Sequence, residues 1–155
     1  MTIRKLQLFL VSTILLILTS SQIAPEERKI NWVDIISIDS LKNTNPKPVF
    51  IDIRADWCGM CKKFDATTLQ EEEVINFLNN NFHSVHFNFH DKRTFTLNGL
   101  EYSDAGKFNS MAKHFEATGL PTFVFLDKEL NTIEIIQGYQ NKKEFLKRLK
   151  NIIED

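Results

Sequence analysis

The sequence has 155 residues, which is enough for one ordinary domain, and 43% of them are hydrophobic, which is enough to form a core. Charged residues make up 25%, as in soluble globular proteins, and the formal net charge at pH 7 is −1. Without a dense basic cluster, this balance argues against nucleic acid or an anionic membrane surface as a partner.

The first 21 residues have the order of a secretory signal peptide. Arg4 and Lys5 form a basic head, residues 6–18 are mostly apolar, and Thr19-Ser20-Ser21 supplies small residues for cleavage. The alternative is a membrane anchor formed by residues 6–18, although a spanning helix needs about 20 apolar residues. We therefore expect a periplasmic or otherwise exported protein whose mature chain begins near Gln22.

The next segment is expected to lead into the folded domain. Residues 22–37 read as a polar N-terminal extension in which Ile30 and Trp32 form a short edge strand. One or two helical turns follow over 37–43 and end at the breaker Asn45-Pro46-Lys47-Pro48. A compact apolar strand over 49–53 then carries one acid, Asp52.

The rest of the chain alternates between helical and strand patterns. In chain order, these patterns predict helices from Cys58 onward and over 71–80, a strand over 85–89, a helix over 105–118 that ends at Gly119, strands over 122–126 and 132–136, and a helix over 141–153. Such an order predicts an α/β fold with a mixed central sheet flanked by helices on both faces.

Residues 91–104 interrupt this order and are expected to contain a β-hairpin around Thr94–Ser103. Apolar residues alternate on both sides of Asn98-Gly99, a strong hairpin signal because both turn positions need positive φ. The register pairs four side chains on one face, Phe95 with Tyr102 and Leu97 with Leu100. We expect this hairpin to flank the segment from Cys58 to Cys61 and to help select the molecules that react there; the alternative is a distant flap.

The two cysteines of the chain, Cys58 and Cys61, are three positions apart at the start of a predicted helix. A disulfide closing so small a loop would stabilise the fold only weakly, so chemistry explains the pair better than structure does. At a helix N-terminus, unpaired N–H groups and the helix dipole favour the thiolate of Cys58, which is the nucleophile of disulfide exchange. Cys61, one turn along, can then attack the mixed disulfide. The spacing therefore predicts a redox disulfide, Cys58–Cys61.

From Val49 to the C-terminus, apart from the insertion, the sequence resembles the thioredoxin family. The resemblance rests on the following segments: Val49-Phe50-Ile51-Asp52 through Ala55-Asp56-Trp57-Cys58-Gly59-Met60-Cys61-Lys62, Leu120-Pro121-Thr122, and Gly138-Tyr139. The Ala-Asp-Trp-Cys form is similar in particular to the exported bacterial branch that receives electrons at the cell surface. The resemblance implies that residues 38–155 adopt a thioredoxin fold and that the protein is a thiol–disulfide oxidoreductase. Two positions depart from the family: Met60 replaces the usual proline, and His86 falls where many thioredoxins carry a lysine.

The resemblance also implies roles for single residues. Asp52 is expected to be buried with a raised pKa and to accept the proton of Cys61, the alternative being an acid that reaches solvent. Pro121 is expected to be cis, to pack against the dithiol and to leave the backbone of Leu120 free to pair with an extended substrate.

The residues around the cysteines are expected to contact substrate. Trp57 should shield the dithiol and touch the client, with a plain core tryptophan as the alternative. Gly59 and Met60, between the cysteines, complete the expected substrate-binding set. Clients are protein disulfides or thiols, and the electron donor is a membrane or periplasmic protein. The protein is expected to act as a monomer.

The sequence also leaves other functions open. His83, His86 and His90 with the cysteines could form a metal site, but His83 would point away from the other two on a strand. Lys62 after the motif disfavours covalent haem, so we expect no metal and no cofactor. A thioredoxin-like module that only binds is a further alternative. Because Gly59-Met60 adds nothing to stabilise the thiolate, the sequence favours a reductase or isomerase over a disulfide-forming oxidase.

Overall fold

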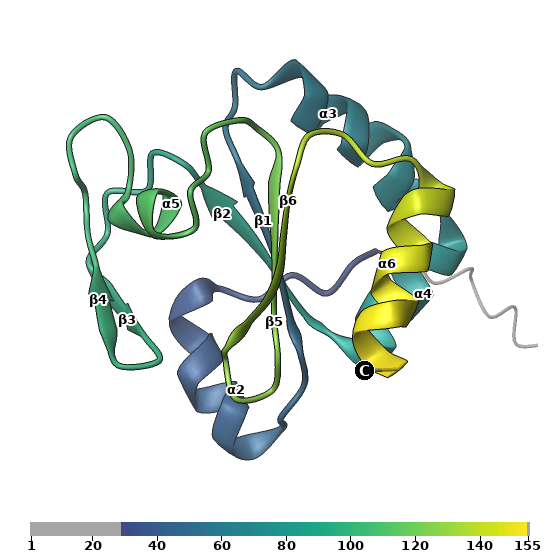
Figure 1. Ribbon diagram of the computed structural model, residues 1–155, viewed down its shortest axis with the longest axis horizontal. Coiled ribbons are helices and arrows are strands. Elements are labelled where there is room, and N and C mark those ends of the chain that lie inside the picture. The colour runs from purple at the N-terminus through teal and green to yellow at the C-terminus, as the bar shows by residue number, and fades with distance from the viewer. Residues whose placement is uncertain (1–28, 155) are drawn as a thin grey trace, which may run out of the picture.

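A four-stranded mixed sheet forms the centre of the protein in the computed structural model, which describes residues 29–154. The strand order is β2-β1-β5-β6, with β1 parallel to β2 and antiparallel to β5, and β5 antiparallel to β6 (Figure 1). This confirms the predicted α/β fold with a mixed sheet. The predicted signal peptide over 1–21 lies outside the described residues.

Most predicted elements form close to their predicted bounds. The strands are β1 (Val49–Arg54), β2 (His83–Asn88), β3 (Phe95–Leu97), β4 (Leu100–Tyr102), β5 (Thr122–Leu126) and β6 (Thr132–Gln137). The helices are η1 (Ile35–Ser37), α2 (Ile38–Thr44), α3 (Gly59–Ala66), η2 (Thr68–Gln70), α4 (Glu72–Asn81), α5 (Ser110–His114) and α6 (Lys142–Glu154).

The side chains of β1 alternate between two apolar layers. Ile51 and Ile53 belong to the layer that α2, α5 and the β3–β4 hairpin cover, whereas Phe50 belongs to the layer covered by α3, α4 and α6 (Figure 1). The Phe50 ring lies 5.3–5.8 Å from three further phenylalanine rings: Phe123, Phe125 and Phe145. Because alternate residues of a strand share a face, Asp52 points into this second, aromatic layer.

The predicted edge strand at Ile30 and Trp32 is wrong. Trp32 makes only an isolated parallel bridge with Ser84. The backbone N–H of Asn31 donates to the side chain of Asn79, and the side chain of Asp34 then caps η1. These side-chain contacts turn the chain out of the strand after one bridge.

The predicted helix over 105–118 is also wrong, because only α5 is helical there. Gly106 has φ +88°, and its N–H donates to the side chain of Asp104, which forms a turn. Asn109 caps α5 by accepting from the N–H of Met111, and Glu116 at φ +50° follows the end of the helix. The apolar spacing of this segment is helical, but local side-chain hydrogen bonds compete with the helix at its start.

The hairpin forms in the predicted register. Asn98 and Gly99 have φ values of +50° and +78°, and Phe95 pairs with Tyr102 as Leu97 does with Leu100. Three of these four side chains are buried, whereas Leu100 is 51% exposed.

The predicted position of the hairpin beside the cysteines is wrong. Its turn contacts α2, where the N–H of Asn98 donates to Asp39 and its side chain accepts from Lys42. The amide of Asn98 also reaches the carbonyl of Leu130 in the β5–β6 turn. That turn follows Leu126, the partner of Val49 at the start of β1, so the hairpin turn lies at the end of the sheet opposite to Cys58 (Figure 1). The hairpin therefore packs on the apolar layer beside α2 and does not flank the cysteines.

Candidate active site

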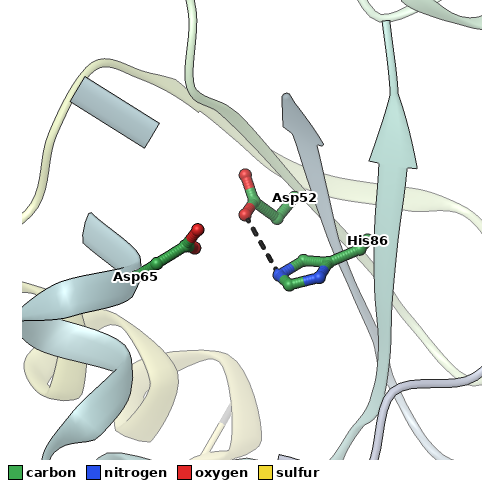
Figure 2. A group of neighbouring side chains, drawn as sticks. All are labelled: Asp52, Asp65 and His86. Atoms are coloured by element: carbon green, nitrogen blue, oxygen red, sulfur yellow. Dashed lines mark ion pairs between the residues drawn. The ribbon is translucent and has the colours of Figure 1, made fainter. Parts of the chain in front are cut away.

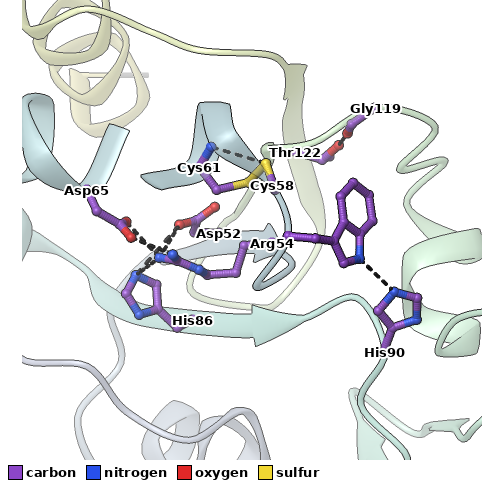
Figure 3. Close-up of a disulfide and its surroundings, with 10 residues drawn as sticks. Asp52, Arg54, Cys58, Cys61, Asp65, His86, His90, Gly119 and Thr122 are labelled. Carbon is purple, nitrogen blue, oxygen red and sulfur yellow. Dashed lines mark hydrogen bonds and ion pairs between the residues drawn. A yellow bond between two sulfur atoms is a disulfide. The ribbon is translucent and has the colours of Figure 1, made fainter. Parts of the chain in front are cut away.

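Cys58 is the N-cap of α3. The chain leaves β1, turns through a hydrogen bond from the N–H of Cys58 to the carbonyl of Ala55, and enters the helix at Gly59. Cys58 and Cys61 are joined as a disulfide with their Cα atoms 5.3 Å apart (Figure 3). The Cys58 Sγ accepts the N–H of Cys61 at 3.1 Å. A thiolate at Cys58 would keep this hydrogen bond and gain from the helix dipole.

The two sulfur-bearing residues differ in access. Cys58 is 5% exposed and Cys61 is fully buried. A sulfur atom that approaches from solvent therefore meets Cys58 first.

Trp57 and Met60 form an exposed apolar rim beside Cys58. Trp57 is 67% exposed and Met60 is 44% exposed, so the alternative of a core tryptophan is wrong. The Trp57 Nε1 donates to the Nε2 of His90 at 3.2 Å, which orients the indole of the residue that precedes Cys58. Gly59 has open space where a Cβ would stand.

The loop before β5 covers the other side of the disulfide. Leu120 packs against Ala55, Cys58 and Cys61, and the Leu120–Pro121 peptide bond is cis, as predicted. Phe89, which follows β2, packs against the same cluster. The sequence therefore brings three distant segments together at the disulfide.

A pocket of about 500 Å³ lies beyond Phe89. Phe89 forms part of its wall, together with Phe108, Ala112 and Thr118. Phe108 comes from the segment that returns from the hairpin, and its ring lies 5.4 Å from that of Phe89. The segment that follows the insertion, and not the hairpin itself, thus packs against Phe89 beside the disulfide cluster.

Asp52 is fully buried. Within the described residues, neither of its carboxylate oxygens has a hydrogen-bond partner. Burial raises the pKa of Asp52 to about 7, against a smaller opposing effect of the Arg54 cation. Figure 3 shows the carboxyl group between the disulfide and the Arg54 guanidinium. A carboxyl with this pKa can both accept and return a proton at neutral pH.

Asp52, Asp65 and His86 form a cluster that resembles a metal site (Figure 2). One ligand atom from each lies within 4.8 Å of the others. The Arg54 guanidinium occupies this cluster, however, because its Nη1 donates to Asp65 at 2.6 Å and lies 3.2 Å from the His86 Nε2 (Figure 3). The protein's own cation therefore stands where a metal ion would bind.

The histidines weighed as metal ligands have different partners. The His83 Nε2 lies 2.7 Å from the carbonyl of Asn45, and the His90 Nε2 accepts from Trp57. His86 stacks on Trp32, with ring centroids 3.4 Å apart, and its Nε2 lies 3.6 Å from Asp52. Burial and the Arg54 charge lower the pKa of His86 to about 4, so its ring is neutral at pH 7. The structure does not bring these three rings together.

Comparison with known proteins gives the family. Residues 37–153 match the thioredoxin-like domain family. The chain belongs to this family. It carries a C-x-x-C pair, joined as a disulfide, at the start of α3.

The curated relatives are longer proteins. The chain is 27% identical over 130 residues to the thiol:disulfide interchange protein DsbD of Yersinia pestis, covering 80% of this chain and 20% of the relative. It is 28% identical over 119 residues to the DsbD of Pectobacterium atrosepticum, covering 76% and 18%. The chain thus spans about a fifth of the length of these relatives.

Solved structures share the fold. The oxidoreductase DsbH aligns with a TM-score of 0.62 at 20% identity, covering 87% of this chain and 92% of that one. A thioredoxin from Thermus thermophilus aligns with a TM-score of 0.63 at 20% identity, covering 81% and 88%. The C-terminal domain of Neisseria meningitidis DsbD in its oxidised form gives 0.53 at 21%, covering 74% and 89%. Among residues 29–154, no helix is long and apolar enough to cross a membrane.

Proposed function

We propose that the protein is an exported reductase or isomerase of protein disulfides that works through Cys58 and Cys61. The observation that carries the proposal is the arrangement of the dithiol. Cys58 is the accessible sulfur at a helix N-terminus, and the disulfide lies close to a buried carboxyl whose pKa is near neutrality. The relatives named for thiol:disulfide interchange support the same chemistry.

The reaction proceeds in two exchanges. The Cys58 thiolate attacks one sulfur of a client disulfide, which forms a mixed disulfide and releases the other client sulfur as a thiolate. The Cys61 thiol then gives its proton to Asp52 and attacks the Cys58 sulfur, which releases the second client thiolate. The client gains two electrons and the protein is left with the Cys58–Cys61 disulfide. A dithiol donor of membrane or periplasmic origin must then reduce that disulfide.

Clients are expected to bind over the apolar rim. Trp57 and Met60 offer exposed apolar surface next to Cys58, and Gly59 leaves space for a close approach. Leu120, beside the cis bond to Pro121, lies against the disulfide, where its backbone could pair with an extended client segment. A polypeptide client, rather than a small thiol, would use all of these contacts.

The redox potential tests the direction of electron flow. Because the dithiol segment adds no charge that would stabilise the reduced form, we expect a potential nearer to thioredoxin's, about −270 mV, than to a strong oxidase's, about −120 mV. Equilibration with glutathione buffers, followed by quantification of free thiols, measures it. The reduced protein should also reduce insulin, and the Cys58→Ser/Cys61→Ser double variant is the control. A potential close to −120 mV without insulin reduction would identify an oxidase instead.

Export is the second part of the proposal. The basic head, apolar stretch and small residues over 1–21 support a cleaved signal peptide. The exported product should then begin at Gln22, which mass spectrometry of intact protein from the periplasm or medium would detect. A chain that keeps residues 1–21 and fractionates with the membrane would show that residues 6–18 form an anchor.

A further inference from the structure

Arg54 is fixed beside the buried carboxyl. It follows Asp52 by two residues on β1, so the two side chains share one face of the strand. The Arg54 side chain is 18% exposed, and its Nη1 lies 3.7 Å from the Asp52 Oδ2. That distance is short enough for a strong charge interaction and too long for a good hydrogen bond.

Asp65 holds Arg54 at this distance. Both terminal nitrogens of the guanidinium donate to the Asp65 carboxylate, a two-point contact with a definite geometry (Figure 3). Without Asp65, Arg54 could turn toward Asp52 and form a direct ion pair that occupies the oxygens. With Asp65 in place, both Asp52 oxygens stay free to receive a proton.

The groups on β2 and β5 that lie beside Asp52 are uncharged at pH 7. His86 on β2 is neutral at pH 7. Phe123, which pairs with Asp52 across β1 and β5, is apolar. Asp56 acts on Arg54 rather than on Asp52. Lys29 lines a small opening together with Asp65 and His86 on the solvent side. The fixed charges closest to Asp52 are therefore one cation and one anion.

These two charges act on Asp52 in opposite senses, since Arg54 favours the ionised carboxyl and Asp65 disfavours it. We propose that Arg54, clamped by Asp65, is a positioning residue that sets the pH at which Asp52 takes the proton of Cys61. This inference rests on the proposed function. It adds two residues, outside the C-x-x-C motif, that tune the release of the client.

Single substitutions that remove one charge each test this inference. Arg54→Met should move the titration midpoint of Asp52 upward by about one pH unit or more, as expected when an opposite charge within 4–6 Å is lost. Asp65→Asn should move it downward. Arg54→Lys, which keeps the charge, should leave the titration midpoint of Asp52 close to its value in the native protein. Lys150→Met on α6 removes an equal charge far from Asp52 and is the matched control. A purely structural role would not shift two midpoints in opposite directions.

Two readouts keep the inference separate from the proposed function. Carbon-13 NMR of the Asp52 carboxyl in the oxidised protein gives the midpoint without any client, with Asp52→Asn for assignment. The pH profile of client release from the Cys58 mixed disulfide gives the catalytic midpoint, which should follow the NMR values. If neither charge variant moves the NMR midpoint, the inference fails and the proposed function stands. If the NMR midpoints move and the release profiles do not, Asp52 is not the proton acceptor, and both this inference and that role are overturned.

Discussion

Replacing Cys61 with serine should trap clients on the protein as mixed disulfides. Cys58, the more exposed residue at the helix N-terminus, would still attack a client disulfide, because its Sγ keeps the hydrogen bond from the backbone N–H of residue 61. The serine hydroxyl cannot resolve the product, so turnover should fall by at least about 100-fold while capture continues. Non-reducing gels, with mass spectrometry of the trapped species, would show this.

Replacing Cys58 with serine should abolish both capture and turnover. The remaining thiol, Cys61, is fully buried, and no client sulfur can reach it in the folded protein. The Cys58→Ser/Cys61→Ser variant sets the background for both single variants. Equal trapping by the two single variants would contradict the assigned roles, and trapping through Cys61 alone would reverse them.

The sequence predicted the dithiol and the strand and helix on either side of it because all three depend on local patterns. A strand, a C-x-x-C motif and a helix follow one another within residues 49–66, and the N-cap position of Cys58 results from that order. The burial of Asp52, which the family resemblance and the otherwise apolar strand predicted, is also confirmed.

The errors arose where side-chain hydrogen bonds, distant or local, decide the structure. The hairpin register followed from Asn98-Gly99, but its position depended on Asp39 and Leu130, which lie 59 and 32 residues away in the chain. The helix expected over 105–118 shortened because the side chains of Asp104 and Asn109 bond to local backbone groups. The spacing of apolar residues does not reveal that side chains compete for the backbone groups of the helix.

Arg54 and Asp65 were missed although the sequence held a signal for both. An arginine two residues after a buried acid shares its face of the strand, and Asp65 lies one helical turn beyond Cys61 on α3. Strand and helix periodicity together could have placed both near Asp52. Neither periodicity fixes the contact itself, which depends on how α3 packs over β1.

Replacing Asp52 with asparagine should slow client release by about 100-fold at neutral pH and leave client capture nearly unchanged, the usual loss for a general base. Release in the native protein should rise with pH through about 7 as Asp52 ionises, and this inflection should disappear in the variant. Stopped-flow measurement of release from a preformed mixed disulfide, next to the rate of its formation, separates the two steps. Slower capture with unchanged release would contradict the assignment.

The same substitution should stabilise the protein, and only at higher pH. Burial raises the folded-state pKa of Asp52 from 3.8 to about 7, so between these values the unfolded chain loses a proton that the folded protein keeps. The free energy of unfolding therefore falls as pH rises from about 4 to 7 and then levels off. The total decrease is about 4 kcal/mol. Asparagine cannot ionise, and its unpaired amide costs the same at every pH. Urea unfolding of the oxidised protein should thus show a gain from Asp52→Asn that is up to about 4 kcal/mol larger at pH 8 than at pH 4. A gain independent of pH would mean that the pKa of Asp52 is the same in the folded and the unfolded protein. A variant that is more stable and slower in release would show that the buried acid is kept for its chemistry.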